Sequence, residues 1–454
     1  MKLFTALIFT LLIVSNLSAQ ISDFSPVTQD DVALVVYDIA DGKNVVSLNG
    51  DKPFSFASNL KLLTTAAALE NLGGGFRFFT FFSFDPADGT LYIKATGDPE
   101  MVVEQLWQLA LELKLKGIKG IKKVVVDDFL YGNSIIHSAV SGDKGDNAYL
   151  AYISPFSLNY NAITIYVKAH EAGKPVEVTL STPSSHFVIK NSATGIAGGD
   201  NRLVVGTSAG KNSKTEILVK GSLGVARSKP ETIFKRVGHP TNYYVSTLLN
   251  LMGEKEELPV SREKIDQQLF SKKENINHTW KSSPLREILR KMNLYSSNFI
   301  ADSLQFFMGA IIRGSSAQGV EILKEYAQNK LGETIDIVNG SGLGNGQNQL
   351  TAEFFIKLLK NVYSDYYSSI DFFASLPVLG EDGTLKKAQT GESTGFVRAK
   401  TGSLTGVASL SGIMKAKSGK LYFFSFSVNN FPAKKFQPMW DFRDKVINEI
   451  WEKY

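Results

Sequence analysis

The 454-residue chain has no cysteine, and this absence removes several kinds of chemistry at once. It excludes disulfides, thiolate metal sites, iron–sulfur clusters, a cysteine nucleophile and a lipid-modified N-terminal cysteine. Histidine is scarce as well, with five residues: His137, His170, His186, His239 and His278. No two of them lie within one helical turn, so a His-x-x-x-His zinc pair is absent and a histidine-centred triad has few candidates. The sequence therefore implies no metal and no cofactor.

A strong excess of one charge is also missing. The 49 basic side chains nearly balance the 44 acidic ones, which leaves a formal net charge of +5, and the basic residues form no clustered runs. Because a nucleic-acid-binding surface needs such clusters, we expect no nucleic-acid partner.

The N-terminal residues carry the pattern of an export signal. Lys2 gives a positive start, residues 3–14 are mostly apolar, and the small residues Ser18 and Ala19 precede Gln20. The apolar run is too short to span a bilayer comfortably, and nothing like it recurs downstream. A buried N-terminal strand or helix is the alternative. We expect cleavage near Ala19 and Gln20 and a soluble periplasmic protein, with no transmembrane segment after signal removal.

Secondary-structure patterns indicate one domain that is interrupted by an insertion. Alternating apolar residues around Asp41-Gly42 predict a β-hairpin over residues 32–49, and an apolar stripe predicts a helix from Ser58 that stops at Gly73. Further helices are expected at residues 100–114, within 283–375 and at 440–454, and further strands at 123–127, 164–168, 176–180, 215–219, 406–415 and 421–429. We therefore expect a split catalytic domain (20–75 and 278–454), an inserted α+β domain (76–161 and 238–277) and a small β domain nested in that insert (162–237).

Ser-x-x-Lys occurs four times, at Ser58/Lys61, Ser141/Lys144, Ser208/Lys211 and Ser261/Lys264. Only Ser58 opens an apolar-striped helix, where positions i and i+3 share a face and Lys61 can reach the serine hydroxyl. Ser141 and Ser208 lie in glycine-rich loops and Ser261 begins a charged surface helix, so these three are most simply solvated. The alternative for Ser58 is the N-cap of its helix.

Ser-x-Asn also occurs four times, and one copy lies among helices. Ser296 and Asn298 belong to a polar turn between the helical patterns of residues 285–292 and 299–308. The alternative is an ordinary helix-start cap.

Lys-Ser/Thr-Gly occurs twice. The copy at Lys417 lies between two strands and is interpreted as a hairpin turn. The copy Lys400-Thr401-Gly402 enters the strand that begins near Ser403, where a glycine lets the backbone approach a ligand closely. An edge-strand turn is the alternative.

The order of these motifs points to a known superfamily. A serine at a helix start, a Ser-x-Asn turn and a Lys-Thr-Gly strand form the motif set of penicillin-binding proteins and serine β-lactamases, which this sequence resembles. The first interval, from Ser58 to Ser296, spans 238 positions, whereas the second, to Lys400, spans 104. So long a first interval resembles the low-molecular-weight class C penicillin-binding proteins, the D-alanyl-D-alanine carboxypeptidase/endopeptidase family (peptidase family S13), which insert extra domains there.

Longer strings strengthen the resemblance. Strings similar to those of the family recur at residues 57–69, 125–128, 340–343, 382–385 and 397–404. Two positions depart from one loop of the family, with Asn339 in place of an aspartate and Gly344 in place of a serine.

The resemblance implies both a fold and a reaction. The fold is the α+β transpeptidase fold of penicillin-binding proteins and serine β-lactamases, an antiparallel sheet with helices on both sides, here with inserted α+β and all-β domains. The reaction is D-Ala-D-Ala carboxypeptidase action, D,D-endopeptidase action or both on peptidoglycan stem peptides, through an acyl-enzyme that β-lactams would trap as covalent inhibitors. A β-lactamase or esterase on the same scaffold and a non-catalytic cell-wall binding protein are the alternatives.

The chemistry of the nucleophile fits this resemblance. A serine hydroxyl needs a base to take its proton, and with no histidine at hand the neutral amine of Lys61 is the available base for Ser58. An exposed lysine has a pKa near ~10.4, so burial and a second cation, for which Lys400 is the candidate, must lower it. Backbone N–H groups of Ser58 and Ser403 would form the oxyanion hole.

The resemblance also assigns the remaining roles. Ser296 would relay the proton to the leaving amine, and Asn298 would hydrogen-bond the peptide chain of the substrate. Lys400 would help to bind the terminal carboxylate, with Thr401 as a hydroxyl donor. The expected catalytic residues are Ser58, Lys61 and Ser296, and the expected substrate-binding residues are Asn298, Lys400, Thr401, Gly402 and Ser403.

Overall fold

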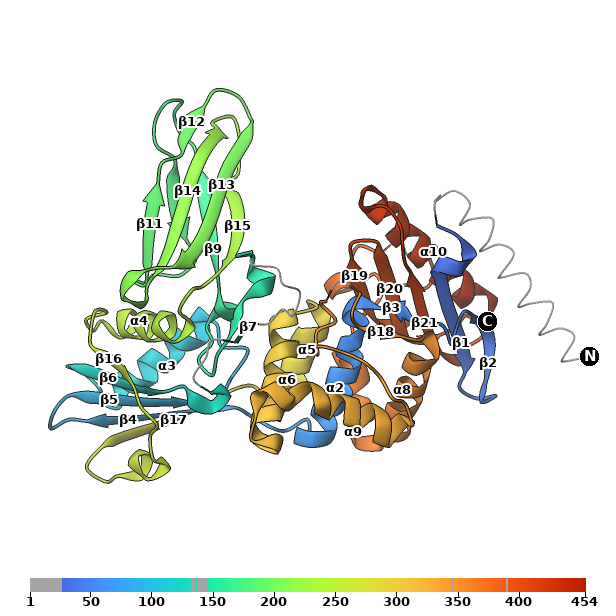
Figure 1. Cartoon of the computed structure of the whole chain (residues 1–454), viewed down its shortest axis with the longest axis horizontal. Helices are drawn as coiled ribbons and strands as arrows, with labels where there is room; N and C mark the ends of the chain where they lie inside the picture. Colours follow the sequence, from blue (N-terminus) through green and yellow to red (C-terminus); the bar gives the residue numbers. More distant parts are fainter. Residues whose placement is uncertain (1–26, 133–135, 138–144, 345, 389–390) are drawn as a thin grey trace, which may run out of the picture. The chain divides into compact units, whose positions relative to one another are not determined.

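The computed structural model describes residues 27–132, 136–137, 145–344, 346–388 and 391–454 (Figure 1). The predicted export signal lies outside the described residues. The chain divides into two compact units. The first unit comprises the described parts of Met1–Phe76 and Pro284–Tyr454, and the second comprises those of Arg77–Ser138 and Gly142–Ser283.

A five-stranded antiparallel sheet forms the centre of the first unit, in the order β19-β20-β21-β1-β2. Its strands are β1 (Val32–Asp38), β2 (Lys43–Leu48), β19 (Val397–Leu404), β20 (Val407–Lys415) and β21 (Leu421–Val428). The predicted N-terminal hairpin and the predicted C-terminal strands are therefore confirmed. Because β1 pairs with β21, the two ends of the chain complete one sheet around the insertion.

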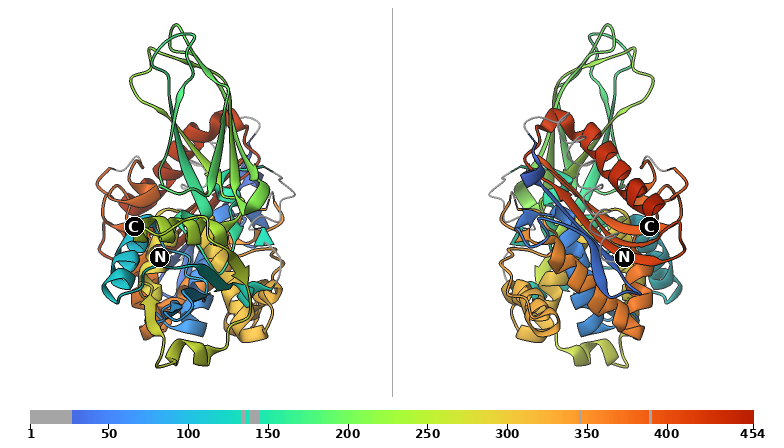
Figure 2. Two further views of the ribbon diagram at one scale, coloured as in Figure 1. Left: turned by 90° about the vertical axis from the view of Figure 1, so that its left-hand side faces the viewer. Right: turned by 90° about the vertical axis from the view of Figure 1, so that its right-hand side faces the viewer.

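Helices cover both faces of this sheet. On β21, Phe426 packs against Phe442 of α10 (Phe436–Lys453), whereas Phe423 packs against Tyr363 of α8 (Ala352–Ser364). Strand residues three apart point to opposite faces, so α10 and α8 lie on opposite sides. The right-hand view of Figure 2 shows α10 along its face of the sheet. The arrangement confirms the predicted fold class.

The remaining helices of the first unit carry or support the motifs found in the sequence. They are α2 (Lys61–Leu72), α5 (Leu285–Leu294), α6 (Asn298–Arg313), α7 (Gly319–Tyr326) and α9 (Tyr366–Ser375). Helix α2 ends at Gly73, whose φ of 76° is a conformation that favours glycine. Residues 61–69 of α2 are all buried, so this helix is buried on every side along that length.

The described part of the second unit contains one five-stranded mixed sheet and three smaller ones, of which one is the two-stranded pair β7 (Ile136–His137) and β8 (Tyr152–Ile153). The mixed sheet has the order β16-β6-β5-β4-β17, formed by β4 (Phe79–Asp85), β5 (Thr90–Ala95), β6 (Lys123–Asp127), β16 (Val260–Arg262) and β17 (Ile276–Lys281). Strand β17 pairs with β4 and so belongs to the second unit. The border between the two units therefore comes after β17, at Ser283, whereas the sequence had predicted this border at residue 278. Ser261 lies on β16, which pairs in parallel with β6, so the prediction of a surface helix there was wrong.

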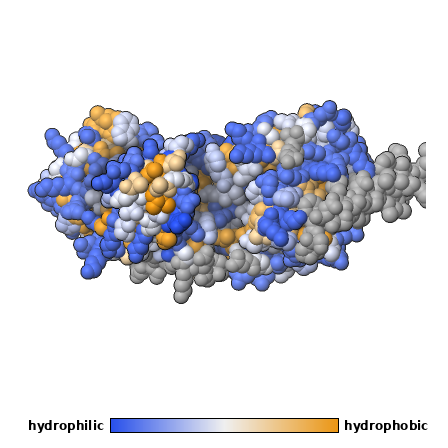
Figure 3. All heavy atoms as spheres, turned by 90° about the horizontal axis from the view of Figure 1, so that it is seen from above, coloured by the Kyte–Doolittle hydropathy of each residue, from blue (hydrophilic) through white to orange (hydrophobic). Residues whose placement is uncertain are grey.

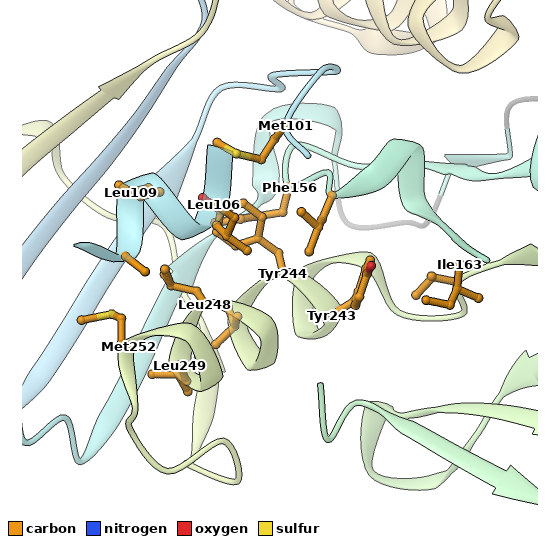
Figure 4. Close-up of a cluster of buried hydrophobic side chains, with 14 of the residues drawn as sticks. Met101, Leu106, Leu109, Phe156, Ile163, Tyr243, Tyr244, Leu248, Leu249 and Met252 are labelled. Atoms are coloured by element: carbon orange, nitrogen blue, oxygen red, sulfur yellow. The ribbon is translucent and has the colours of Figure 1, made fainter. Parts of the chain in front are cut away.

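The other two smaller sheets are built from residues 162–236. One has the order β10-β9-β15, and in the other β14 pairs with β11, β12 and β13. The strands are β9 (Ala162–Lys168), β10 (Glu177–Leu180), β11 (Phe187–Asn191), β12 (Thr194–Ile196), β13 (Asn201–Ala209), β14 (Thr215–Gly224) and β15 (Glu231–Arg236). Helices α3 (Val103–Leu115) and α4 (Pro240–Met252) complete this unit, and Figure 4 shows side chains from both in one apolar core.

In the view of Figure 3 the surface is mostly hydrophilic, and the apolar residues form separate patches. Among the described residues, no helix combines the length and the apolar character that crossing a membrane requires.

Candidate active site

Ser58 lies in a tight turn at the start of the buried helix α2. The short strand β3 (Phe54–Ser55) leads into a single 3₁₀ turn, Ala57–Leu60, and α2 begins at Lys61. Ala57, directly before Ser58, has a φ of 48°, which a non-glycine residue adopts only at a cost in energy. Ser58 is half-buried and does not cap the helix. The N-cap alternative for Ser58 is therefore wrong.

A row of small polar side chains on β20 and β21 anchors this turn. We call Ser409, Ser411, Ser425 and Ser427 the serine row. All four are buried, and they face the turn or each other. Ser409 Oγ donates to the carbonyl of Phe56 at 2.7 Å, and Asn59 Nδ2 donates to Ser411 Oγ at 2.8 Å. Larger side chains would hold the turn further from the sheet.

Two glycines allow the backbone to approach the turn from either side. A Cβ atom on Gly402 of β19 would lie 2.2 Å from the carbonyl oxygen of Phe56, and one on Gly342 would lie 2.0 Å from that of Ala57. Gly342 also has a φ of 79°. The Lys-Thr-Gly strand and the loop of residues 340–343 therefore contact the turn through backbone alone.

Lys61 points its amine at Ser58 and is held there by two carbonyl groups. Its Nζ atom lies 2.9 Å from Ser58 Oγ, 2.7 Å from Asn298 Oδ1 and 2.6 Å from the backbone oxygen of Ser341. Because carbonyl oxygens only accept hydrogen bonds, the amine donates one N–H to each. In neutral Lys61 the lone pair is then directed to the remaining neighbour, the Ser58 hydroxyl.

Burial makes the neutral form of Lys61 available near neutral pH. The side chain is fully buried, and this burial lowers its pKa to about 7. The carboxyl of Asp302 acts in the opposite direction and raises the pKa. Burial is the largest cause of this lowering, whereas the sequence had suggested Lys400 as a second cation that contributes to it. Lys400 is itself buried, and burial together with Lys61 lowers its pKa well below the usual value.

Ser296 reaches the site from the turn between α5 and α6. Ser297, not Ser296, caps α6, because Ser297 Oγ accepts from the N–H of Ile300. Ser296 has a φ of 54°, and its hydroxyl accepts a hydrogen bond of 2.8 Å from Lys400 Nζ. Because Ser297 is the N-cap residue, the Ser296 hydroxyl is not used as a cap and instead contacts Lys400.

The Lys-Thr-Gly strand supplies the other side of the site. Lys400 Nζ also donates to the carbonyl of Thr401 at 2.8 Å, and Thr401 Oγ1 donates to Thr384 Oγ1 at the same distance. Thr384 and Ser403 are exposed, so both lie open to a ligand. The predicted residues of all three motifs are thus brought together in one site.

Sequence reasoning missed three contributors to this site. The carbonyl of Ser341 holds Lys61, the carboxyl of Asp302 lies buried near Lys61, and the hydroxyl of Thr384 meets Thr401. Ser341 and Thr384 belong to strings that resemble the family. The signal for Asp302 was an acidic residue in an apolar helix, four positions after Asn298 and so on the same face. Across the described part of the chain, no cluster of three or more His, Asp or Glu residues could hold a metal ion.

Substitution of Gly342 by alanine is expected to displace Ser58. The new Cβ would collide with the carbonyl of Ala57, and a displacement of about 1 Å can cost about 10²-fold in rate. We expect the rate of acylation by a fluorescent penicillin to fall by that order. Gly332→Ala is the matched control, because Gly332 has a φ of 68° but open space at its Cβ. Equal acylation rates in the two variants would contradict the role of Gly342.

Comparisons with known proteins place this chain in a family. The profile of the D-Ala-D-Ala carboxypeptidase 3 (S13) family matches residues 13–445. A D-alanyl-D-alanine carboxypeptidase of Actinomadura sp. is 30% identical over 417 residues, which cover 86% of this chain and 76% of that protein. The D-alanyl-D-alanine carboxypeptidase DacB of Haemophilus influenzae is 25% identical over 453 residues, which cover 93% and 91%.

A solved structure shows the same fold. Penicillin binding protein 4 (dacB) of Haemophilus influenzae matches with a TM-score of 0.77 at 22% identity, over 97% of this chain and 99% of that one. The family profile covers nearly the whole chain, and the relatives named above are similar to this chain over most of their own length. The chain therefore belongs to the D-Ala-D-Ala carboxypeptidase 3 (S13) family and is an enzyme of that family.

Proposed function

We propose that this protein is an exported, periplasmic serine D,D-peptidase that acts on peptidoglycan stem peptides through an acyl-enzyme on Ser58. The relatives named above are D-alanyl-D-alanine carboxypeptidases, which supports the substrate class. The observation that carries the mechanism is the position of Lys61 Nζ, fixed by the carbonyl oxygens of Asn298 and Ser341 so that its third neighbour is Ser58 Oγ.

Acylation begins when Ser58 Oγ attacks the carbonyl carbon of the penultimate D-alanine. Lys61 takes the hydroxyl proton, and the carbonyl oxygen becomes an oxyanion bound by the backbone N–H groups of Ser58 and Ser403. The proton then passes to the leaving nitrogen through Ser296, and the C–N bond breaks. Free D-alanine leaves, or the amino side of a cross-link leaves if the enzyme acts as an endopeptidase.

Deacylation returns the enzyme to its starting state. Water attacks the acyl carbon, and the base of the site, for which Lys61 is the candidate, accepts a proton from this water. Ser58 Oγ then leaves the acyl carbon and takes a proton from the same base. A β-lactam would form the same ester with Ser58, so we expect it to inhibit the enzyme by remaining attached.

The carboxylate end of the substrate is assigned to the Lys-Thr-Gly strand. Lys400 donates to Ser296 Oγ and to the carbonyl of Thr401, and Thr401 Oγ1 donates to the hydroxyl of Thr384. An arriving carboxylate favours the charged form of Lys400, which burial alone disfavours. Asn298 and Gly402 would contact the peptide chain.

The predicted division of the insert into an α+β domain and a nested β domain (162–237) also stays a proposal.

The test uses two substrates and one inhibitor with the purified full-length protein. A stem peptide that ends in D-Ala-D-Ala and a D,D-cross-linked dimer are incubated separately, and the products are measured by mass spectrometry. We expect release of D-alanine, cleavage of the dimer or both, and loss of each activity after penicillin treatment. Penicillin hydrolysis within seconds without peptide cleavage would identify a β-lactamase instead. Binding of the peptides without any product would identify a non-catalytic cell-wall binding protein.

A further inference from the structure

Asp302 is a buried carboxyl group that the proposed mechanism does not use. It lies on α6, one turn after Asn298, and none of its side chain is exposed to solvent. It is close to Ser341, whose hydroxyl and N–H face it, but neither carboxyl oxygen accepts a hydrogen bond of ordinary geometry from the described residues. A buried carboxylate without hydrogen bonds is costly unless a cation or a proton compensates it.

Lys61 is the cation that Asp302 faces. The two side chains interact through space, while the hydrogen bonds of Lys61 Nζ go to three other atoms. Burial raises the pKa of the Asp302 carboxyl, and Lys61 opposes that rise. Lys400 on β19 is a second buried cation that interacts with Lys61, and Lys400 also interacts with Arg443 on α10. Arg443 has its own carboxylate partner, because its guanidinium donates to Asp444 Oδ1. Asp302 is thus the acidic group that interacts with Lys61.

Together Lys61 and Asp302 form a pair with two arrangements of one proton. In one arrangement the amine is neutral and the carboxyl is protonated; in the other the lysine is an ammonium and the aspartate a carboxylate. Both arrangements hold one proton and carry no net charge, so neither adds a net charge to the buried site. Loss of that proton leaves the Lys61 amine beside the Asp302 carboxylate, and this form accepts the proton that Ser58 gives up and so returns to the ammonium–carboxylate pair.

We propose that Asp302 is a positioning residue for the general-base step, where its carboxyl stabilises the ammonium that Lys61 becomes when it takes the Ser58 proton. This inference rests on the proposed function of Lys61. It predicts that Asp302 sets the pH at which the base becomes active. Removal of its charge lowers the pKa of Lys61, because the nearby opposite charge of Asp302 favours the charged form of the lysine.

The pH profile of acylation tests the proposal. The second-order rate constant for a fluorescent penicillin is measured between pH 4 and 9 for the wild type, Asp302→Asn and Asp302→Glu. In Asp302→Asn we expect the acid limb to move about 1–3 pH units lower and the plateau to fall, because the lysine is then a weaker base. Asp302→Glu keeps the charge, so its acid limb is expected to stay with that of the wild type. An Asp302→Asn limb that coincides with the wild-type limb would overturn the proposal.

A stability measurement tests the same pair without any activity. In Lys61→Met the buried Asp302 loses its cation and keeps a raised pKa. A raised carboxyl pKa in the folded state gives stability that is present below the unfolded value of ~3.9 and is lost as the pH rises through the folded pKa. We expect the melting temperature of Lys61→Met to fall over that range and Lys61→Met/Asp302→Asn to show no such fall. Parallel pH dependences in the two variants would refute the pairing, whereas a wild type that penicillin never labels would refute only the proposed function.

Discussion

Replacement of Ser58 by alanine is expected to abolish both penicillin labelling and D-alanine release. Loss of the nucleophile in a serine hydrolase lowers kcat by about 10⁶-fold, because no covalent intermediate can form. Among the described residues, the Ser58 hydroxyl makes its hydrogen bond with Lys61 and supports no other element of the fold, so the fold should be retained. A gel of protein incubated with fluorescent penicillin, together with circular dichroism of the same samples, measures both effects.

The control for this substitution is Ser208→Ala. Ser208 belongs to another Ser-x-x-Lys string, lies exposed on β13 and is in the second unit. We expect this variant to label like the wild type. Stable labelling of Ser58→Ala, or mapping of the adduct to a peptide without Ser58, would contradict the assignment of the nucleophile.

Replacement of Lys61 by methionine is expected to leave a serine that is present but inactive. Methionine keeps most of the volume of the side chain and removes the amine, and loss of a general base typically costs 10²–10⁴-fold in rate. The carbonyl oxygens of Asn298 and Ser341 also lose their donor, which costs about 1–3 kcal/mol for each buried group left unpaired. We expect acylation to slow by at least two orders of magnitude and the melting temperature to fall.

Lys417→Met provides the matched control for Lys61→Met. Lys417 lies in the other Lys-Ser/Thr-Gly string, and its side chain is exposed in the turn between β20 and β21. Time courses of penicillin labelling distinguish the two variants. Wild-type labelling by Lys61→Met would show that another group accepts the Ser58 proton.

The local pattern of the chain was sufficient to predict much of the first unit. The hairpin at Asp41-Gly42 and the strands β20 and β21 alternate apolar and polar or small residues clearly enough to be recognised from sequence. Strand β16 was not predicted because it has only three residues and is formed by its parallel pairing with β6. Such a pairing is a tertiary contact that leaves no local signal in the sequence. Burial of α2 on every side similarly exceeded what its apolar stripe indicated.

The sequence predicted those parts of the site in which the chemistry requires a particular side chain. It did not predict the parts to which a backbone group contributes. Ser58, Lys61 and Lys400 stand in recognisable motifs. The carbonyl of Ser341 carries no side-chain signal, because any residue offers a backbone oxygen. Asp302 could be found only when α6 was known to place it beneath Asn298, near a lysine from another helix.

The serine row has a further consequence for catalysis. Its hydroxyls and the missing side chain of Gly402 bring the turn that carries Ser58 against β19 and β20 through short, buried contacts with little rotational freedom. The N–H groups proposed to bind the oxyanion belong to this turn and to β19, so their separation is fixed before substrate arrives. Such preorganised dipoles need no reorganisation when charge develops in the transition state, and their cost is met during folding instead of during each turnover.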